Sequence, residues 1–295
     1  MAATEDYTSL VPFYTFPDRL EEQIEALRTN PLLQRMKDYR KSYDGDPHRP
    51  IYHYVNPEHT LNDPNGLCFW QGKWHLFYQA YPPEDTRQHW GHVYSEDLVH
   101  WHDLPLAIYP DPEDKCYSGS IFVEENRVIA MYHGIEEGQM VAVSSDPLLL
   151  NWEKITDKAV IPDIIPDDKG RPYRVGDPCI WREEDGYYSL SGGFTDGSIF
   201  NDCRMAEFLF YSQDLERWIF LGSFIENDIF TLKSAQRYAD NGYVVAVPFI
   251  FHWWSKSAGI EIKREEFRDD WTIPDLNAAY DLLSSLDNVD AERIG

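Results

Sequence analysis

The sequence predicts an all-β protein of the β-propeller type, and two repeated features carry this prediction. Between residues 66 and 193, short segments of alternating polar and apolar residues fold back around turn residues three times. Each of these hairpins is followed by another strand and then by a similar closing phrase, approximately Ser-x-Asp-Leu-x-x-Trp. A period of roughly 40–50 residues holding about four strands is typical of propeller blades.

The predicted hairpins differ in sequence but share one form. They read GLCFWQGKWHLFYQAY around Gln71-Gly72, SIFVEENRVIAMYHG around Glu125-Asn126, and CIWREEDGYYSLSGG around Asp185-Gly186. The closing phrases run from Ser95 to Trp101, from Ser145 to Trp152 in a slightly expanded form, and from Ser212 to Trp218. Their tryptophans lie 51 and 66 positions apart. A β-sandwich with coincidental turns remains the alternative fold.

A helical segment is predicted before the strands, over residues 18–42. Asp18 and Glu21 have the spacing of an N-cap and its partner, and apolar residues then recur on one helix face at Leu20, Ile24 and Leu27. The turn-rich stretch DGDPHRP follows. We therefore expect an N-terminal helical arm and linker at 1–50, packed outside a propeller at 51–270, and a helical tail at 271–295.

Composition restricts the functional classes. The formal net charge of −25 opposes binding to nucleic acid or to an anionic membrane surface. Four widely spaced cysteines form no zinc motif and no dense disulfide framework. The N-terminus MAATEDYTSL lacks the pattern of a secretory signal, and no apolar run approaches the ~18 residues of a membrane helix. We expect a cytoplasmic protein with reduced thiols.

Two aspartates precede prolines at corresponding places in the repeats. Asp63 lies in Asn-Asp-Pro-Asn-Gly at the start of the first blade, and Asp177 lies in Gly-Asp-Pro at the start of the third. Proline biases the residue before it towards extended backbone, so it can fix the orientation of an aspartate at the start of a strand. Such motifs are also ordinary turns. Paired carboxylates across a cleft are what glycosidic bond cleavage requires.

Residues 48–193, about half of the chain, resemble the N-terminal part of glycoside hydrolase family 32, the invertases, levanases and inulinases. The matching phrases, in order, are His53-Tyr54 before LNDPNG, then KWHLFYQAYP, HWGHVYSEDLVHW, LPLAIYP, YSGS and GDPCIW. This resemblance implies a five-bladed propeller and retaining double displacement on fructosides. It makes Asp63 the nucleophile and Asp177 the stabiliser of the oxocarbenium-like transition state. The residues implied for the fructose subsite are Asn62, Gln79, Trp90 and Ser118.

The chain departs from the family pattern in three places. The family's Arg-Asp-Pro is Gly176-Asp177-Pro178 here, with Arg174 as a candidate substitute for the arginine. Thr60-Leu61 replaces the tryptophan usually found two places before the Asn-Asp-Pro-Asn-Gly motif. No Glu-Cys-Pro phrase supplies the acid/base. Glu226 is nearest to the expected position, with Asp228 as a rival and a surface acidic turn as the alternative.

Five histidines invite a metal interpretation that the pattern does not support. They lie on predicted strands without helical pairing or cysteine partners: His75, His89, His92, His100 and His102. Structural or hydrogen-bonding roles are expected for them. Displacement by carboxylates needs neither a metal nor a cofactor, and we expect none.

The leading prediction is a retaining β-fructofuranosidase acting on sucrose or fructans, and the alternative is a propeller that binds fructosides without efficient catalysis. An arabinan-directed enzyme is disfavoured by the Asn-Asp-Pro-Asn-Gly and Phe-Tyr-Gln phrases. Residues 241–254 are expected to supply two strands of a fourth blade, and residues 260–286 read as one strand and a helix. The sequence thus predicts a propeller that is incomplete at the C-terminus and has little or no hydrolytic activity.

Overall fold

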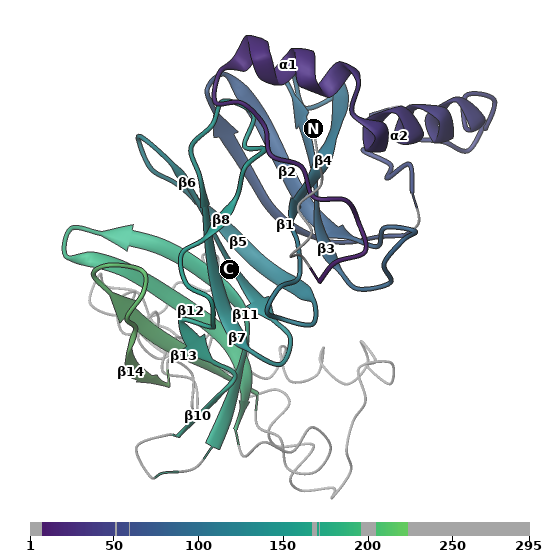
Figure 1. The fold of residues 1–295 in the computed structure, drawn as a ribbon. Coiled ribbons are helices and arrows are strands. Elements are labelled where there is room, and N and C mark those ends of the chain that lie inside the picture. Colours follow the sequence, from purple (N-terminus) through teal and green to yellow (C-terminus); the bar gives the residue numbers. More distant parts are fainter. Residues whose placement is uncertain are drawn as a thin grey trace, which may run out of the picture. The chain divides into compact units, whose positions relative to one another are not determined.

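The described part of the protein is mostly β-sheet with two helices (Figure 1). Its structure, a computed structural model, describes residues 8–50, 52–58, 60–166, 170, 172–195 and 205–223. All of these residues fall in one compact unit of the chain. Neither helix in this described part has the length and apolar character needed to cross a membrane.

The strands form three antiparallel sheets, each from a continuous stretch of chain. The first sheet has the order β1 (Leu61–Trp70), β2 (Lys73–Ala80), β3 (His89–Ser95) and β4 (Trp101–Ile108). The second contains β5 (Cys116–Val123), β6 (Val128–Gly134), β7 (Gly138–Ser144) and β8 (Glu153–Lys154), and β9 (Ile161–Pro162) also pairs with β7. The third contains β10 (Ile164–Pro166), β11 (Pro172–Glu183), β12 (Gly186–Thr195), β13 (Met205–Ser212) and β14 (Ile219–Ser223). Sheets of consecutive strands are the arrangement expected of propeller blades.

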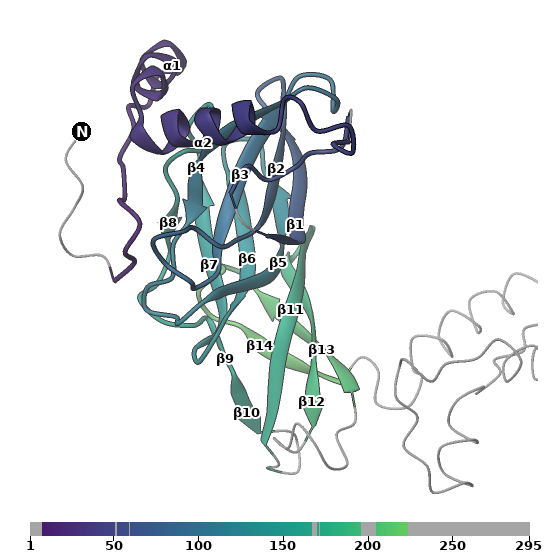
Figure 2. The same ribbon diagram turned by 90° about the vertical axis from the view of Figure 1, so that its right-hand side faces the viewer.

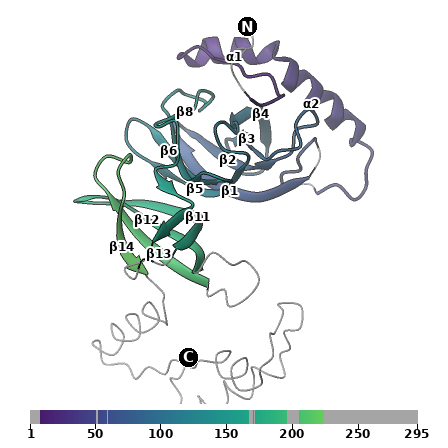
Figure 3. The same cartoon turned by 60° about the horizontal axis from the view of Figure 1, so that its bottom comes forward.

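The first strands of the three hairpins lie next to one another. Strand β5 contacts both β1 and β11, as Figure 3 shows. Gly66 on β1 allows this approach, because a Cβ there would lie 2.4 Å from Cγ1 of Ile121 on β5. Between β5 and β11, the amide of Ile180 donates a hydrogen bond of 2.9 Å to Oγ of Ser120. Candidate residues on these three strands are therefore held in one region.

Strand β6, in the second sheet, packs apolar side chains on both of its faces. Its even-numbered residues, such as Ala130 and Tyr132, pack with Phe77 and Trp90 of the first sheet. Odd-numbered residues of β6, such as Met131, pack towards the third sheet. Because successive side chains of a strand point to opposite faces, one apolar strand fills both inter-sheet cores.

The predicted hairpins are present in the structure. Strands β1 and β2 join through Gln71 and Gly72, whose φ angles of 44° and 84° suit a two-residue turn of type I′. In the third hairpin Gly186 already pairs with Glu183. The turn is therefore formed by the two residues before Gly186, one position earlier than expected.

The closing phrases are local hydrogen-bonded turns. Oγ of Ser95 accepts hydrogen bonds from the backbone amides at positions 97 and 98, and Oδ1 of Asp97 accepts from those at 99 and 100. Ser212 and Asp214 repeat this arrangement. In the second copy the serine that donates to the aspartate is Ser144, whose Oγ lies 3.1 Å from Oδ2 of Asp146, one position before the phrase noted in the sequence.

The helical segment contains two helices instead of one. Helix α1 spans Leu20–Arg28 and α2 spans Pro31–Ser42. Oδ1 of Asn30 accepts hydrogen bonds from the amides of Leu32 and Leu33, which makes Asn30 the N-cap of α2. Arg19 occupies the N-cap position of α1 without a side-chain bond, so the prediction of Asp18 as a cap is wrong.

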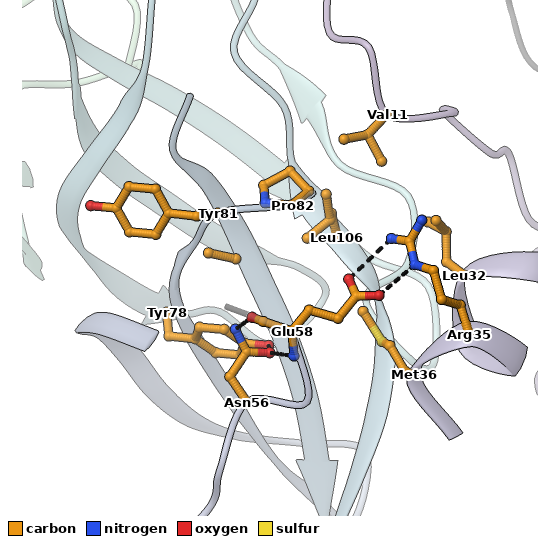
Figure 4. Close-up of a pocket in the computed structure, with 11 residues that line it drawn as sticks. Val11, Leu32, Arg35, Met36, Asn56, Glu58, Tyr78, Tyr81, Pro82 and Leu106 are labelled. Carbon is orange, nitrogen blue, oxygen red and sulfur yellow. Dashed lines mark hydrogen bonds and ion pairs between the residues drawn. The ribbon is translucent and has the colours of Figure 1, made fainter. Parts of the chain in front are cut away.

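Helix α2 lies against β4 (Figure 2), and two of its arginines form partly buried charge pairs. Figure 4 shows the guanidinium of Arg35 pointing at the carboxylate of Glu58, with Nη2 and Oε2 3.0 Å apart. The same guanidinium also bonds Glu84. One turn further along, Nη2 of Arg40 donates to Oδ1 of Asp103 on β4 at 2.6 Å.

Several predictions concern residues outside the described part of the chain. The acid/base candidate Glu226, its rival Asp228, the strands expected at 241–254 and the tail at 271–295 all lie there. The number of blades, their closure and the domain boundaries stay predictions.

Candidate active site

The first strands of the three hairpins, β1, β5 and β11, each have a β-bulge at a candidate residue. At each of these places the register advances one residue further on this strand than on its partner, and β1 has a second such shift between Pro64 and Gly66. The extra residues fall between Leu61 and Pro64 on β1, between Cys116 and Gly119 on β5, and between Gly176 and Pro178 on β11. These intervals contain Asp63, Ser118 and Asp177. A bulge re-aims a side chain that regular pleating would direct elsewhere.

Asp63 is the centre of a polar network that joins the first two sheets. Its Oδ2 accepts a hydrogen bond of 2.6 Å from Oγ of Ser118 and one of 3.4 Å from Nε2 of Gln79. Gln79 is 2% exposed, and its Nε2 also donates to Oγ of Ser118 at 2.9 Å. Nδ2 of Asn62 donates to Oε1 of Gln79 at 2.8 Å. The structure therefore brings together four of the sequence-predicted residues.

Trp90 lies behind this network. It is fully buried, and its Nε1 donates a hydrogen bond of 2.9 Å to the carbonyl of Tyr117. Since Tyr117 immediately precedes Ser118 in the bulge, this bond fixes the backbone that presents the Ser118 hydroxyl. A direct contact of Trp90 with a sugar stays a prediction.

Asp177 and Arg174 line a separate feature, a cavity of about 670 Å³ beside β11. Asp177 is exposed and has a φ angle of 41°, in the left-handed region that non-glycine residues seldom adopt, so the extended backbone expected before Pro178 is wrong at this residue. Nε of Arg174 lies 3.8 Å from Oδ2 of Asp163, so the guanidinium is directed to that carboxylate. The described lining of this cavity does not include Asp63.

Three titratable residues that line this cavity, His133, Glu136 and Asp163, were not identified from the sequence. His133, at the end of β6, contributes its ring to the lining, and its Nε2 lies 3.8 Å from Oδ1 of Asp163. Burial lowers the pKa of His133, with Asp163 and Asp177 acting in the opposite direction. In the sequence, His133 was marked only by its place in the phrase MYHG, which ends the second predicted hairpin.

Two of the histidines with expected structural roles form a buried pair. Nδ1 of His75 and Nε2 of His92 are 2.9 Å apart. Burial lowers the pKa of His75 to about 4 and that of His92 in the same direction. Within the described ranges, no three histidine, cysteine or carboxylate side chains are placed to hold a metal ion.

Comparison with known proteins decides the family. The family model described as glycosyl hydrolases family 32 N-terminal domain matches residues 53–235. The chain belongs to glycosyl hydrolase family 32. The match covers β1 to β14, and thus all three bulged strands that carry the candidate residues.

Relatives in family 32 include a sucrose-6-phosphate hydrolase from Zymomonas mobilis, 34% identical over 190 residues, which are 58% of this chain and 35% of that protein. A fructan 6-exohydrolase from Beta vulgaris is 32% identical over 199 residues, 62% of this chain and 32% of that protein. The chain therefore spans about a third of the length of these relatives.

Solved structures of family 32 agree with the fold. The β-fructofuranosidase BmSUC1 of Bombyx mori has a TM-score of 0.52 and 30% identity, covering 67% of this chain and 43% of that one. The sucrose-6-phosphate hydrolase from Lactobacillus gasseri has a TM-score of 0.53 and 28% identity, covering 66% of this chain and 40% of that one.

Proposed function

We propose that this family 32 chain hydrolyses β-fructofuranosidic bonds of sucrose or fructans by retaining double displacement, with Asp63 as the nucleophile. The observation that carries this proposal is the hydrogen-bond network around Asp63. The relatives named as sucrose-6-phosphate hydrolase and fructan 6-exohydrolase support the class of substrate.

The contacts of Asp63 suit a carboxylate nucleophile. Ser118 and Gln79 both donate to Oδ2, whereas Oδ1 has no hydrogen-bond partner among the described residues. One oxygen is thus held in place and the other is available to attack an anomeric carbon. Orienting a reacting atom in advance removes much of the entropic barrier to the reaction.

Asp177 is proposed to stabilise positive charge that develops on the sugar ring in the transition state. Its carboxylate is exposed and borders the cavity beside β11. A fixed negative group is most effective where charge appears only in the transition state, because it costs no reorganisation at that moment. The left-handed backbone at Asp177 is consistent with a carboxylate that is held in a fixed orientation.

Protonation of the leaving oxygen is assigned to Glu226, which lies outside the described residues. Unchanged fructose release from sucrose by Glu226→Gln would exclude this assignment, because a retaining glycosidase needs a group that protonates the leaving oxygen.

The test is fructose release by the purified 295-residue chain incubated separately with sucrose, inulin and levan. Asp63→Asn is expected to abolish release while the protein remains folded, because the amide is nearly isosteric but cannot form the glycosyl-enzyme ester. Asp38→Asn, an exposed aspartate on α2, is the matched control and is expected to retain full activity. Retention of most activity by Asp63→Asn would exclude it as the nucleophile.

One observation favours the alternative, a chain that binds fructosides without cleaving them. The described lining of the cavity beside Asp177 does not include Asp63, whereas catalysis needs both carboxylates on one sugar. Saturable sucrose binding without fructose release would support this alternative.

A further inference from the structure

His133 stands where the second and third sheets meet. On β6 it faces the bulge of β5, because Cys116 pairs with Gly134 and Gly119 pairs with Tyr132. Its ring packs edge-on against Tyr117, with centroids 6.2 Å apart and an interplanar angle of 81°. His133 thus adjoins the backbone that presents Ser118 to Asp63, and at the same time lines the cavity of Asp177.

The ring of His133 also occupies space next to Gly176. A Cβ on Gly176 would lie 3.5 Å from Nδ1 of His133, which is ordinary contact. Any longer side chain pointing the same way would meet the imidazole. Gly176 therefore lies within contact range of the His133 ring, and an arginine at position 176 that extended in this direction would meet the imidazole.

The polar atoms of His133 are available to a ligand. Neither ring nitrogen hydrogen-bonds a residue in the described part of the chain, and the 3.8 Å to Asp163 exceeds hydrogen-bond distance. The side chain is 16% exposed and lies on the cavity wall. Burial lowers its pKa and so favours the neutral ring, which offers one donor and one acceptor.

We propose that His133 is a further substrate-binding residue, which takes over the place of an arginine before Asp177 and hydrogen-bonds a hydroxyl of the bound fructosyl unit. This inference rests on the proposed function, since it requires a fructoside between Asp63 and Asp177.

The experiment measures sucrose affinity by calorimetry in the full chain carrying Asp63→Asn, so that the ligand is not consumed. Adding His133→Ala is expected to weaken binding about tenfold, the loss of roughly one hydrogen bond to substrate. His133→Gln, which keeps a donor and an acceptor, is expected to lose less. His100→Ala, at an exposed turn, is the matched control and is expected to bind as the Asp63→Asn chain does.

A reciprocal substitution tests the shared volume. Gly176→Arg is expected to weaken binding because the arginine meets the imidazole. In the Gly176→Arg/His133→Ala double variant the arginine fills the vacated space, and binding is expected to be at least about threefold tighter than in either single variant. Circular dichroism and thermal melting identify any variant that fails to fold.

The outcomes separate this inference from the proposed function. No sucrose binding by the Asp63→Asn chain and no fructose release by the unmutated chain would refute both. Normal binding with folded His133→Ala and His133→Gln variants that bind equally well would refute the role of His133 alone. If the loss of binding free energy in the double variant equals the sum of the losses in the two single variants, the two side chains do not compete for one volume.

Discussion

Removing the positive charge of Lys154 should destabilise the second sheet strongly. Nζ of Lys154 donates to the carbonyls of Tyr109 and Asp111 at 2.8 and 2.6 Å, and to Oε1 of Glu113 at 2.6 Å. The Glu113 side chain is completely buried. Its Oε1 also accepts from the Tyr132 hydroxyl at 2.7 Å. Lys154→Met therefore leaves a buried carboxylate without its cation.

The expected magnitude follows from that burial. Removing one partner of a buried ion pair costs about 3–5 kcal/mol. For a domain of this size, 1 kcal/mol shifts Tm by about 2–4 °C, so Lys154→Met should lower Tm by about 10 °C. Glu113→Gln/Lys154→Met should recover part of the loss, since no uncompensated charge remains.

Scanning calorimetry of the full chain measures these shifts, with Lys158→Met at an exposed neighbouring lysine as the control. A Tm for Lys154→Met within about 2 °C of the unmutated chain would refute the reasoning. A double variant as unstable as Lys154→Met would show that lost packing, and not the isolated charge, is the cause.

Three further predictions concern the site and its pH dependence. Ser118→Ala removes the 2.6 Å hydrogen bond to Asp63 and should lower the rate of fructose release about 10–100-fold in steady-state kinetics; an unchanged rate would make that bond irrelevant to catalysis. Asp177→Asn should lower kcat by about 10²–10³, and weaker binding with unchanged kcat would identify Asp177 as a binding residue instead. Burial lowers the pKa of His75 and of His89 to about 4, so between pH 6.5 and 4 the unfolded chain binds protons there that the folded chain does not. The free energy of unfolding should therefore decrease as the pH is lowered through this window, by about 2 kcal/mol per histidine at pH 5. Urea titrations at pH 7 and 5 measure this, and equal midpoints would contradict the burial argument.

Features encoded within a few residues were predictable from the sequence. The hairpin at Gln71-Gly72 and the closing turn at Ser95 depend on φ preferences and on hydrogen bonds that span no more than five positions. The family motifs identified Asp63 as a candidate because they mark it locally. Local reasoning failed in the helical segment, where α1 ends at Arg28 with Thr29 as its C-cap and Asn30 caps a second helix.

What the tertiary structure decided is which distant residues meet. Ser118 lies 55 positions from Asp63, and their hydrogen bond exists because bulges on β1 and β5 turn both side chains to one point. The sequence determined that position 176 is a glycine and that position 133 is a histidine. Only the packing of β6 beside β11 shows that these two residues lie within contact range, because side-chain contacts across sheets depend on strand order and register, which no short motif encodes.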